Sequence, residues 1–204
     1  MNFLAHLYLS KDNKNILIGN FIADAIKGRN YKEYDKEIQL GILLHREIDN
    51  YTDKHPIVRK SKRRLHERYN HYDGVIIDII YDHYLAKNWH IYSEIPLDVY
   101  ADSVYNFLES KNDIFPTKIQ NILPFMIQYN WLVAYASTEG IRQVLKGMNN
   151  RTKGRSKMDL AIDDLKIHYN EFEEDFTLFF EDLKKFTEEK TLALFSQWKT
   201  PFTS

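Results

Sequence analysis

The sequence predicts an all-α protein, folded as a single-domain helical bundle. Apolar residues recur at helical spacing along almost the whole chain, and no two alternating apolar and polar runs are joined by a hairpin turn. With 204 residues and 44% hydrophobic content, the chain has the size and apolar content of one ordinary domain. We therefore expect one domain over residues 1–204, without internal repeats or a dividing linker.

Clusters of Gly, Pro, Asn and Asp mark the expected ends of the helices, because these residues favour turns or interrupt a helix. They divide the chain into roughly seven to nine helices. The expected breaks lie near Gly28–Asn30, His55–Pro56, Asn70–Gly74, Glu94–Pro96, Asp113–Pro116, Pro124 and Asn149–Ser156.

Composition and charge exclude several classes of function. The chain has no Cys, which excludes a disulfide scaffold and a thiol nucleophile, so a bound metal must be held by His, Asp or Glu. The formal net charge is -1, which gives no strong field to recruit nucleic acid or a membrane. The apolar run at the amino terminus is too short for secretion or for spanning a bilayer. We expect a cytoplasmic protein.

The segment Glu37–Asp53 carries polar residues on a face that should be buried. Ile38, Ile42, His45 and Asp49 follow one another at steps of four, three and four, so they share one stripe of a helix. A histidine and a carboxylate therefore interrupt an apolar face.

Two further segments also place charged residues where the apolar pattern predicts burial. Asp24 stands alone among apolar residues, and Asp78 and Asp82 lie one turn apart in the hydrophobic segment Val75–His83. A buried, unpaired carboxylate is costly, so these groups need a metal, cations or hydrogen-bond donors. Carboxylate and imidazole ligands suit Mn, Fe or Mg, and a bundle core can gather them from facing helices. The candidates are Asp24, His45, Asp49, Asp78, Asp82 and His83; for any one of them alone, a structural role is the simpler interpretation.

The segment Lys54–Arg68 predicts a strongly basic helix. The segment contains a single acidic residue, Glu67. Its cations are Lys54, Arg59, Lys60, Lys62, Arg63, Arg64 and Arg68. Such a face can attract an acidic partner or can simply be solvated. Nucleic acid is the weaker interpretation, because the chain is nearly neutral and has no recognised nucleic-acid motif.

A long helix is expected at about residues 157–190. Its apolar residues alternate at four and three positions, as in a coiled-coil seam. The seam could form a dimer, but packing across the core of its own domain is the simpler interpretation. The short tail, 195–204, carries no signal, and the oligomeric state is left open.

Six stretches resemble the acyl-carrier-protein phosphodiesterase family in order and spacing. They cover roughly residues 1–175 and are Asn2–Leu7, Gly19–Asp24, Gly41–Asp53, Asp78–Leu85, Trp131–Val133 and Val144–Met148. The resemblance implies an atypical relative of the HD phosphohydrolases, which are helical proteins whose His and Asp ligands hold a divalent metal. Manganese is favoured, with Fe²⁺ or Mg²⁺ as alternatives.

The segment Leu44–Asp49 departs from the HD pattern. Arg46 stands where that pattern has an Asp directly after the His. The usual ligand set therefore does not transfer unchanged, and Asp24, Asp49 or Asp82 must supply the missing carboxylate.

The resemblance implies hydrolysis of the phosphodiester that joins 4′-phosphopantetheine to a serine of holo acyl carrier protein. The expected metal ligands are Asp24, His45, Asp49 and Asp82. His6 and His83 are expected to transfer a proton to the leaving serine oxygen or to orient ligands, and Asp78 to orient His83 or a water. Arg46 suits either a phosphate oxygen or a salt bridge to a nearby carboxylate.

Acyl carrier proteins are strongly acidic, so the basic helix is the expected docking surface. Its expected contact residues are Arg59, Lys60, Lys62, Arg63 and Arg64. Two alternatives remain open at this stage: an HD-type hydrolase of a small phosphorylated nucleotide, and a non-enzymatic helical interaction module.

Overall fold

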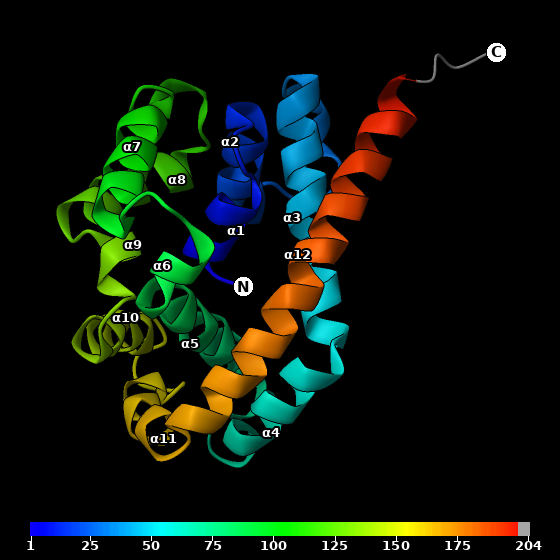
Figure 1. Ribbon diagram of the computed structural model, residues 1–204. Helices are drawn as coiled ribbons and strands as arrows, with labels where there is room; N and C mark the ends of the chain where they lie inside the picture. Colours follow the sequence, from blue (N-terminus) through cyan, green and yellow to red (C-terminus); the bar gives the residue numbers. More distant parts are fainter. Residues whose placement is uncertain (200–204) are drawn as a thin grey trace.

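The computed structural model describes the backbone of residues 1–199, and this part of the chain is helical without any strand (Figure 1). The expected all-α, single-domain architecture is confirmed. Five short 3-10 turns lie between the α-helices, which are α1 (Phe3–Leu9), α2 (Lys14–Ile22), α3 (Lys36–Lys54), α4 (Pro56–Tyr69), α5 (Asp73–Lys87), α6 (Trp89–Tyr92), α7 (Leu97–Glu109), α8 (Thr117–Gln128), α9 (Trp131–Ala134), α10 (Thr138–Arg151), α11 (Ala161–Ile167) and α12 (Tyr169–Lys199).

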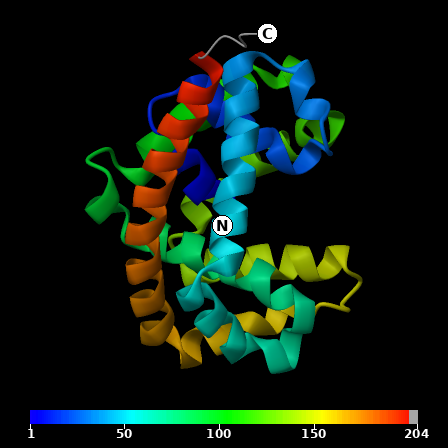
Figure 2. The ribbon, with the colours of Figure 1, turned by 90° about the vertical axis from the view of Figure 1, so that its right-hand side faces the viewer.

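The longest helix, α12, crosses the molecule beside α3 (Figures 1 and 2). The Tyr51 and Phe186 rings stack at 4.1 Å, and the Lys190 ammonium lies 3.1 Å from Glu47, so the two helices run antiparallel. The apolar seam of α12 is buried in the core of its own domain, at Phe172, Phe176, Phe179, Phe180 and Leu183. Packing within the chain therefore accounts for the seam.

The backbones of α2 and α3 approach each other closely at two glycines. A Cβ atom at Gly19 would lie 2.2 Å from the carbonyl oxygen of Ile38, and one at Gly41 would lie 2.3 Å from that of Ile16. Only glycine permits this approach without moving a helix. The contact fixes α3, and with it His45, against the last turns of α2.

We expect Gly41→Ala to lower the free energy of unfolding by about 3 kcal/mol, because the added methyl group must push two backbones apart. Gly147→Ala is the control, since a Cβ atom there would have no neighbour within 4 Å and alanine favours a helix. Urea denaturation of the two variants measures the difference. Equal stability would show that α2 and α3 can separate freely.

Two expected boundaries were wrong. The helix expected at 157–190 is interrupted at His168, so α11 ends at Ile167, and α12 continues past 190 to Lys199. The Tyr84 hydroxyl donates to the carbonyl oxygen of Tyr169 at 2.6 Å, which fixes the point where the chain turns onto the core. The helix also occupies 195–199 of the expected tail, and residues 200–204 lie outside the described part.

The break expected at Pro124 was also wrong, because this proline lies inside α8. A proline removes only one helical N–H donor, and Leu123 and Met126 beside it are buried and hold the helix in place. The helices outnumber the seven to nine expected because α6 and α9 are single turns and α11 is separate from α12. Among the described residues, no helix is both long and apolar enough to cross a membrane.

Candidate metal centre

Two histidines and an aspartate converge where α1 meets α3. The His6 and His45 rings stack with their centroids 3.8 Å apart and an interplanar angle of 16°. Asp49 lies across both ring edges: Nε2 of His6 is 3.1 Å from its Oδ1, and Nε2 of His45 is 3.1 Å from its Oδ2. One ligand atom from each of these three residues lies within 4.8 Å of the other two.

This spacing suits a single divalent ion. Two ligand atoms at right angles about an ion, each about 2.1 Å from it, lie about 3.0 Å apart. Two imidazoles and a carboxylate are ligands that Mn, Fe and related ions accept. Three protein ligands leave coordination positions for water and substrate, as catalytic metal sites require.

One hydrogen bond to the backbone orients His45. Its Nδ1 donates to the carbonyl oxygen of Asn20 at 2.9 Å, which directs Nε2 toward Asp49 and toward Asp24, whose Oδ1 is 3.3 Å away. An imidazole held through its second nitrogen is typical of metal ligands. The Asp24 side chain is 72% exposed, so it lies on the solvent side of the site.

Without a bound metal ion, the site holds one proton on the His45 imidazole, between the carboxylates of Asp24 and Asp49. Burial opposes charge on His45, but hydrogen bonds to Asp24 and Asp49 outweigh it and raise its pKa to about 9. Burial and the neighbouring His45 lower the pKa of His6 to about 4. Burial opposes ionisation of Asp49, but its hydrogen bonds to both histidines lower its pKa well below the usual range. One protonated imidazole thus lies between two carboxylates, in a place that suits a cation.

Asp82 does not lie with this group. Its side chain is fully buried, and it accepts hydrogen bonds from the backbone N–H groups of Asn2, Leu4 and Ala5 at 3.3, 2.8 and 3.4 Å. Burial raises the pKa of Asp82 to about 7, against the opposing effects of the Met1 ammonium and of the Leu4 and Asn2 N–H groups. Asp82 therefore anchors the start of α1, the helix that carries His6.

The other two residues expected on α5 are engaged elsewhere. His83 is buried, its Nδ1 donates to the carbonyl oxygen of Tyr135 at 2.7 Å, and its Nε2 lies 2.8 Å from the Tyr169 hydroxyl. Asp78 accepts a hydrogen bond from the α-amino group of Met1 at 2.9 Å, and this amine lies 3.8 Å from Asp49. Asp78 thus borders the site, whereas His83 joins α5 to α12.

Arg46 does not form the salt bridge to a nearby carboxylate that the sequence suggested as one of its two roles. Its guanidinium donates to the carbonyl oxygens of Gly28 and Ile26 at 2.9 and 3.0 Å and lies over the Tyr31 ring. It fixes the loop between α2 and α3, rather than pairing with Asp49 or Asp53.

The cations expected on the basic helix, α4, divide into two faces. Lys60, whose side chain is 60% exposed, and the largely buried Arg64 both donate to the buried carboxylate of Asp175, at 2.8 and 2.6 Å. The outward cations, Arg59, Lys62 and Arg63, line a shallow pocket of about 350 Å³ with His66 and Asp73. Of these three, Arg59 and Arg63 form no ion pair within the described residues, whereas the Lys62 ammonium lies 3.7 Å from Asp53 and 3.8 Å from Asp73.

Sequence reasoning missed some of the residues that shape the site. Asn20 orients His45 through its backbone carbonyl. Every residue has such a carbonyl, so this contact cannot be predicted from the type of residue at position 20. His6 was expected in proton transfer, although it lies with the candidate ligands. Its position in a short apolar helix is the signal that could have indicated its burial.

Comparison with known proteins gives a consistent result. The family model described as acyl carrier protein phosphodiesterase matches residues 1–183. A protein of this name from Photorhabdus laumondii is 32% identical, over 93% of this chain and 96% of the relative. Proteins of the same name from Pectobacterium atrosepticum (31% identical, over 85% and 90%) and Yersinia enterocolitica (29%, over 94% and 100%) are also similar. No solved structure matches the chain significantly.

Proposed function

The chain belongs to the acyl carrier protein phosphodiesterase family, and we propose on this basis that it releases 4′-phosphopantetheine from holo acyl carrier protein. Water attacks the phosphorus, the bond from phosphorus to the serine oxygen breaks, and apo carrier protein leaves with its serine hydroxyl restored. The reaction is hydrolysis of a phosphodiester.

We propose that the reaction depends on a divalent cation, with Mn²⁺ favoured. The observation that supports this is the convergence of His6, His45 and Asp49, with ligand atoms within 4.8 Å of one another. A bound divalent cation would lower the pKa of a coordinated water and neutralise charge on the phosphoryl oxygens. This ligand set adds His6 to the one expected from the sequence and omits Asp24 and Asp82.

Asp24 has a separate role in this proposal. It lies on the exposed side of the site, and its hydrogen bond with His45 lowers its pKa, so it is ionised at neutral pH. An exposed carboxylate at this point can accept a hydrogen bond from the attacking water and orient it. His83, with both ring nitrogens engaged, is assigned to structure rather than to proton transfer.

The outward face of α4 is proposed to contact the carrier protein. Arg59 and Arg63 are exposed and form no ion pair within the described part of the chain, whereas Lys60 and Arg64 are bound to Asp175. Charge reversal at Arg59 and Arg63 therefore tests docking, while reversal at Arg64 would also disturb the contact of α4 with α12.

We expect Mn²⁺ binding to release about one proton at neutral pH, because the cation needs the Nε2 that is protonated on His45. The pKa of His45 is raised to about 9 and that of His6 is lowered to about 4, so His45 alone carries the proton between about pH 5 and 9. Affinity should then fall about tenfold for each pH unit below 8. Calorimetry in two buffers of different ionisation enthalpy counts the proton. Binding with no proton release at pH 7 would contradict this protonation state.

A further inference from the structure

The loop between α2 and α3 carries three cations that no described residue neutralises. Lys27, Arg29 and Lys32 are exposed, and none of them forms an ion pair with a side chain in the described part of the protein. The acidic residues of the same loop are Asp24, Glu33 and Asp35, which lie toward its two ends, so that residues 25–32 carry three cations and no acid. The centre of the loop is therefore positively charged.

Arg46 holds this loop at the edge of the metal centre. It donates to two loop carbonyls, at Gly28 and Ile26, and Tyr31 stacks against its guanidinium. Arg46 follows His45 directly on α3, and Asp24, just before the loop, lies 3.3 Å from His45. The loop is thus tied to the helix that supplies two of the three proposed ligands.

The outward cations of α4 lie at the opposite side of the site along α3. Asp53 follows Asp49 by one helical turn, and the Lys62 ammonium is 3.7 Å from Asp53. The rise from His45 to Asp53 is about 12 Å. Asp49 therefore lies between two cationic surfaces, one on the α2–α3 loop and one on α4.

We propose that Lys27, Arg29 and Lys32 form a second docking surface, which receives an acidic protein surface while α4 receives another part of the same partner. This inference rests on the proposed function, because the partner is the protein that carries the scissile phosphodiester. Two cationic surfaces on either side of the site would orient an acidic partner with its modified serine over the metal centre. Charge complementarity of this kind raises the rate of encounter and fixes orientation.

The test is charge reversal on the loop, with Lys27→Glu and Arg29→Glu combined. Holo acyl carrier protein is the probe, with Mn²⁺ present. We expect kcat/KM to fall about tenfold at low ionic strength through a higher KM, with kcat unchanged, and the difference to narrow as salt is added.

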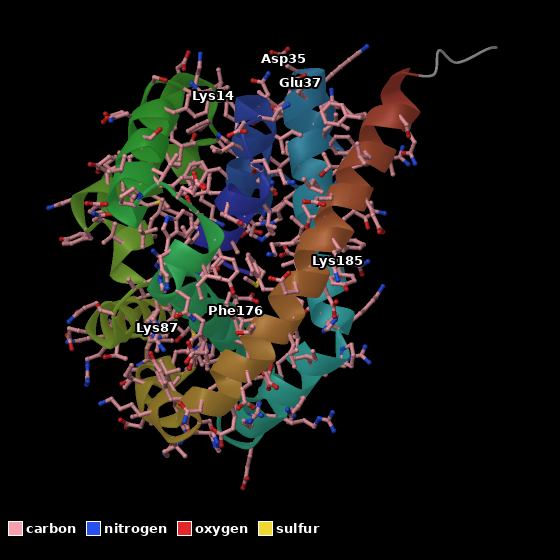
Figure 3. The ribbon with its side chains drawn as sticks, viewed as in Figure 1. Lys14, Asp35, Glu37, Lys87, Phe176 and Lys185 are labelled. Carbon is pink, nitrogen blue, oxygen red and sulfur yellow. The ribbon has the colours of Figure 1, made fainter. Side chains whose placement is uncertain are left out.

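The matched control combines Lys166→Glu with Lys185→Glu, which changes the net charge by the same amount. Both residues are exposed, and Lys185 lies on α12 (Figure 3), the helix that packs on the side of α3 bearing Glu47 and Tyr51. This control should keep at least half of the parent kcat/KM.

Three results would overturn the inference: equal kcat/KM for the loop variant and the control, a difference that salt does not narrow, or a fall in kcat with unchanged KM. Failure of the proposed function looks different. In that case the parent protein itself would release no 4′-phosphopantetheine at any salt concentration.

Discussion

Replacement of His45 by Ala, or of Asp49 by Asn, is expected to lower kcat/KM on holo acyl carrier protein by about three orders of magnitude or more. Each change removes a proposed ligand, and the lost cation would otherwise contribute several kcal/mol of transition-state stabilisation. His45 is buried and the Asp49 side chain is 41% exposed, but neither belongs to the apolar core that packs the helices, so the helical circular dichroism signal should persist.

The measurement pairs turnover with metal content after purification. His90→Ala is the control, because His90 is an exposed histidine with no ion pair among the described residues. A His45 variant that retains both full activity and bound metal would remove His45 from the site.

The second large effect is expected from replacing Asp82 by Ala. This variant distinguishes a residue that anchors the start of α1 from one that binds the metal. Asp82→Ala leaves three backbone N–H groups at the start of α1 without their acceptor. We expect the free energy of unfolding of the metal-free protein to fall by about 3 kcal/mol or more, and activity to fall because His6 loses its position. Thermal unfolding with chelator present measures this effect.

Two variants make the Asp82 result interpretable. Asp82→Asn keeps one acceptor oxygen for the Leu4 N–H and should recover part of the stability. Asp163→Ala removes an exposed acid from α11 and should change the stability by less than about 0.5 kcal/mol. If Asp82→Ala loses metal binding while its metal-free stability is unchanged, Asp82 is a ligand and the anchoring role is wrong.

Helical periodicity was sufficient to predict the fold class, because almost every helix buries one apolar face. It could not predict where α11 ends. That boundary depends on tertiary contacts of Tyr169 with Tyr84 and His83, which periodicity does not encode. The break expected at Pro124 failed for a related reason, since burial of its neighbours outweighs the loss of one hydrogen bond.

The sequence indicated which polar residues are buried, but not what each of them contacts. His45 and Asp49 share a stripe, and the structure places them together. Asp82 shows the same signal as Asp49, yet it binds backbone N–H groups. An unpaired carboxylate in an apolar segment predicts a need for donors, and only the fold decides whether a metal, a cation or a helix terminus meets that need.

For the basic helix, too, the sequence does not show which charged residues form contacts within the protein. Its cations are alike in sequence, but Arg64 contacts the buried Asp175 while Arg59 and Arg63 face solvent. The cationic loop at Lys27 and Arg29 gave no signal in sequence because Asp24, Glu33 and Asp35 equal its three cations in number, although no ion pair joins them in the described part of the protein. Its importance follows from the contact with Arg46 beside the site.

The most direct test of the account is the intact mass of holo acyl carrier protein after incubation with the purified protein. The protein is first stripped with EDTA and then assayed with and without added Mn²⁺. We predict no change in the carrier without metal and loss of one 4′-phosphopantetheine group when Mn²⁺ is restored. Unchanged holo carrier in both reactions would contradict the proposed activity, and equal loss in both would contradict its dependence on a metal.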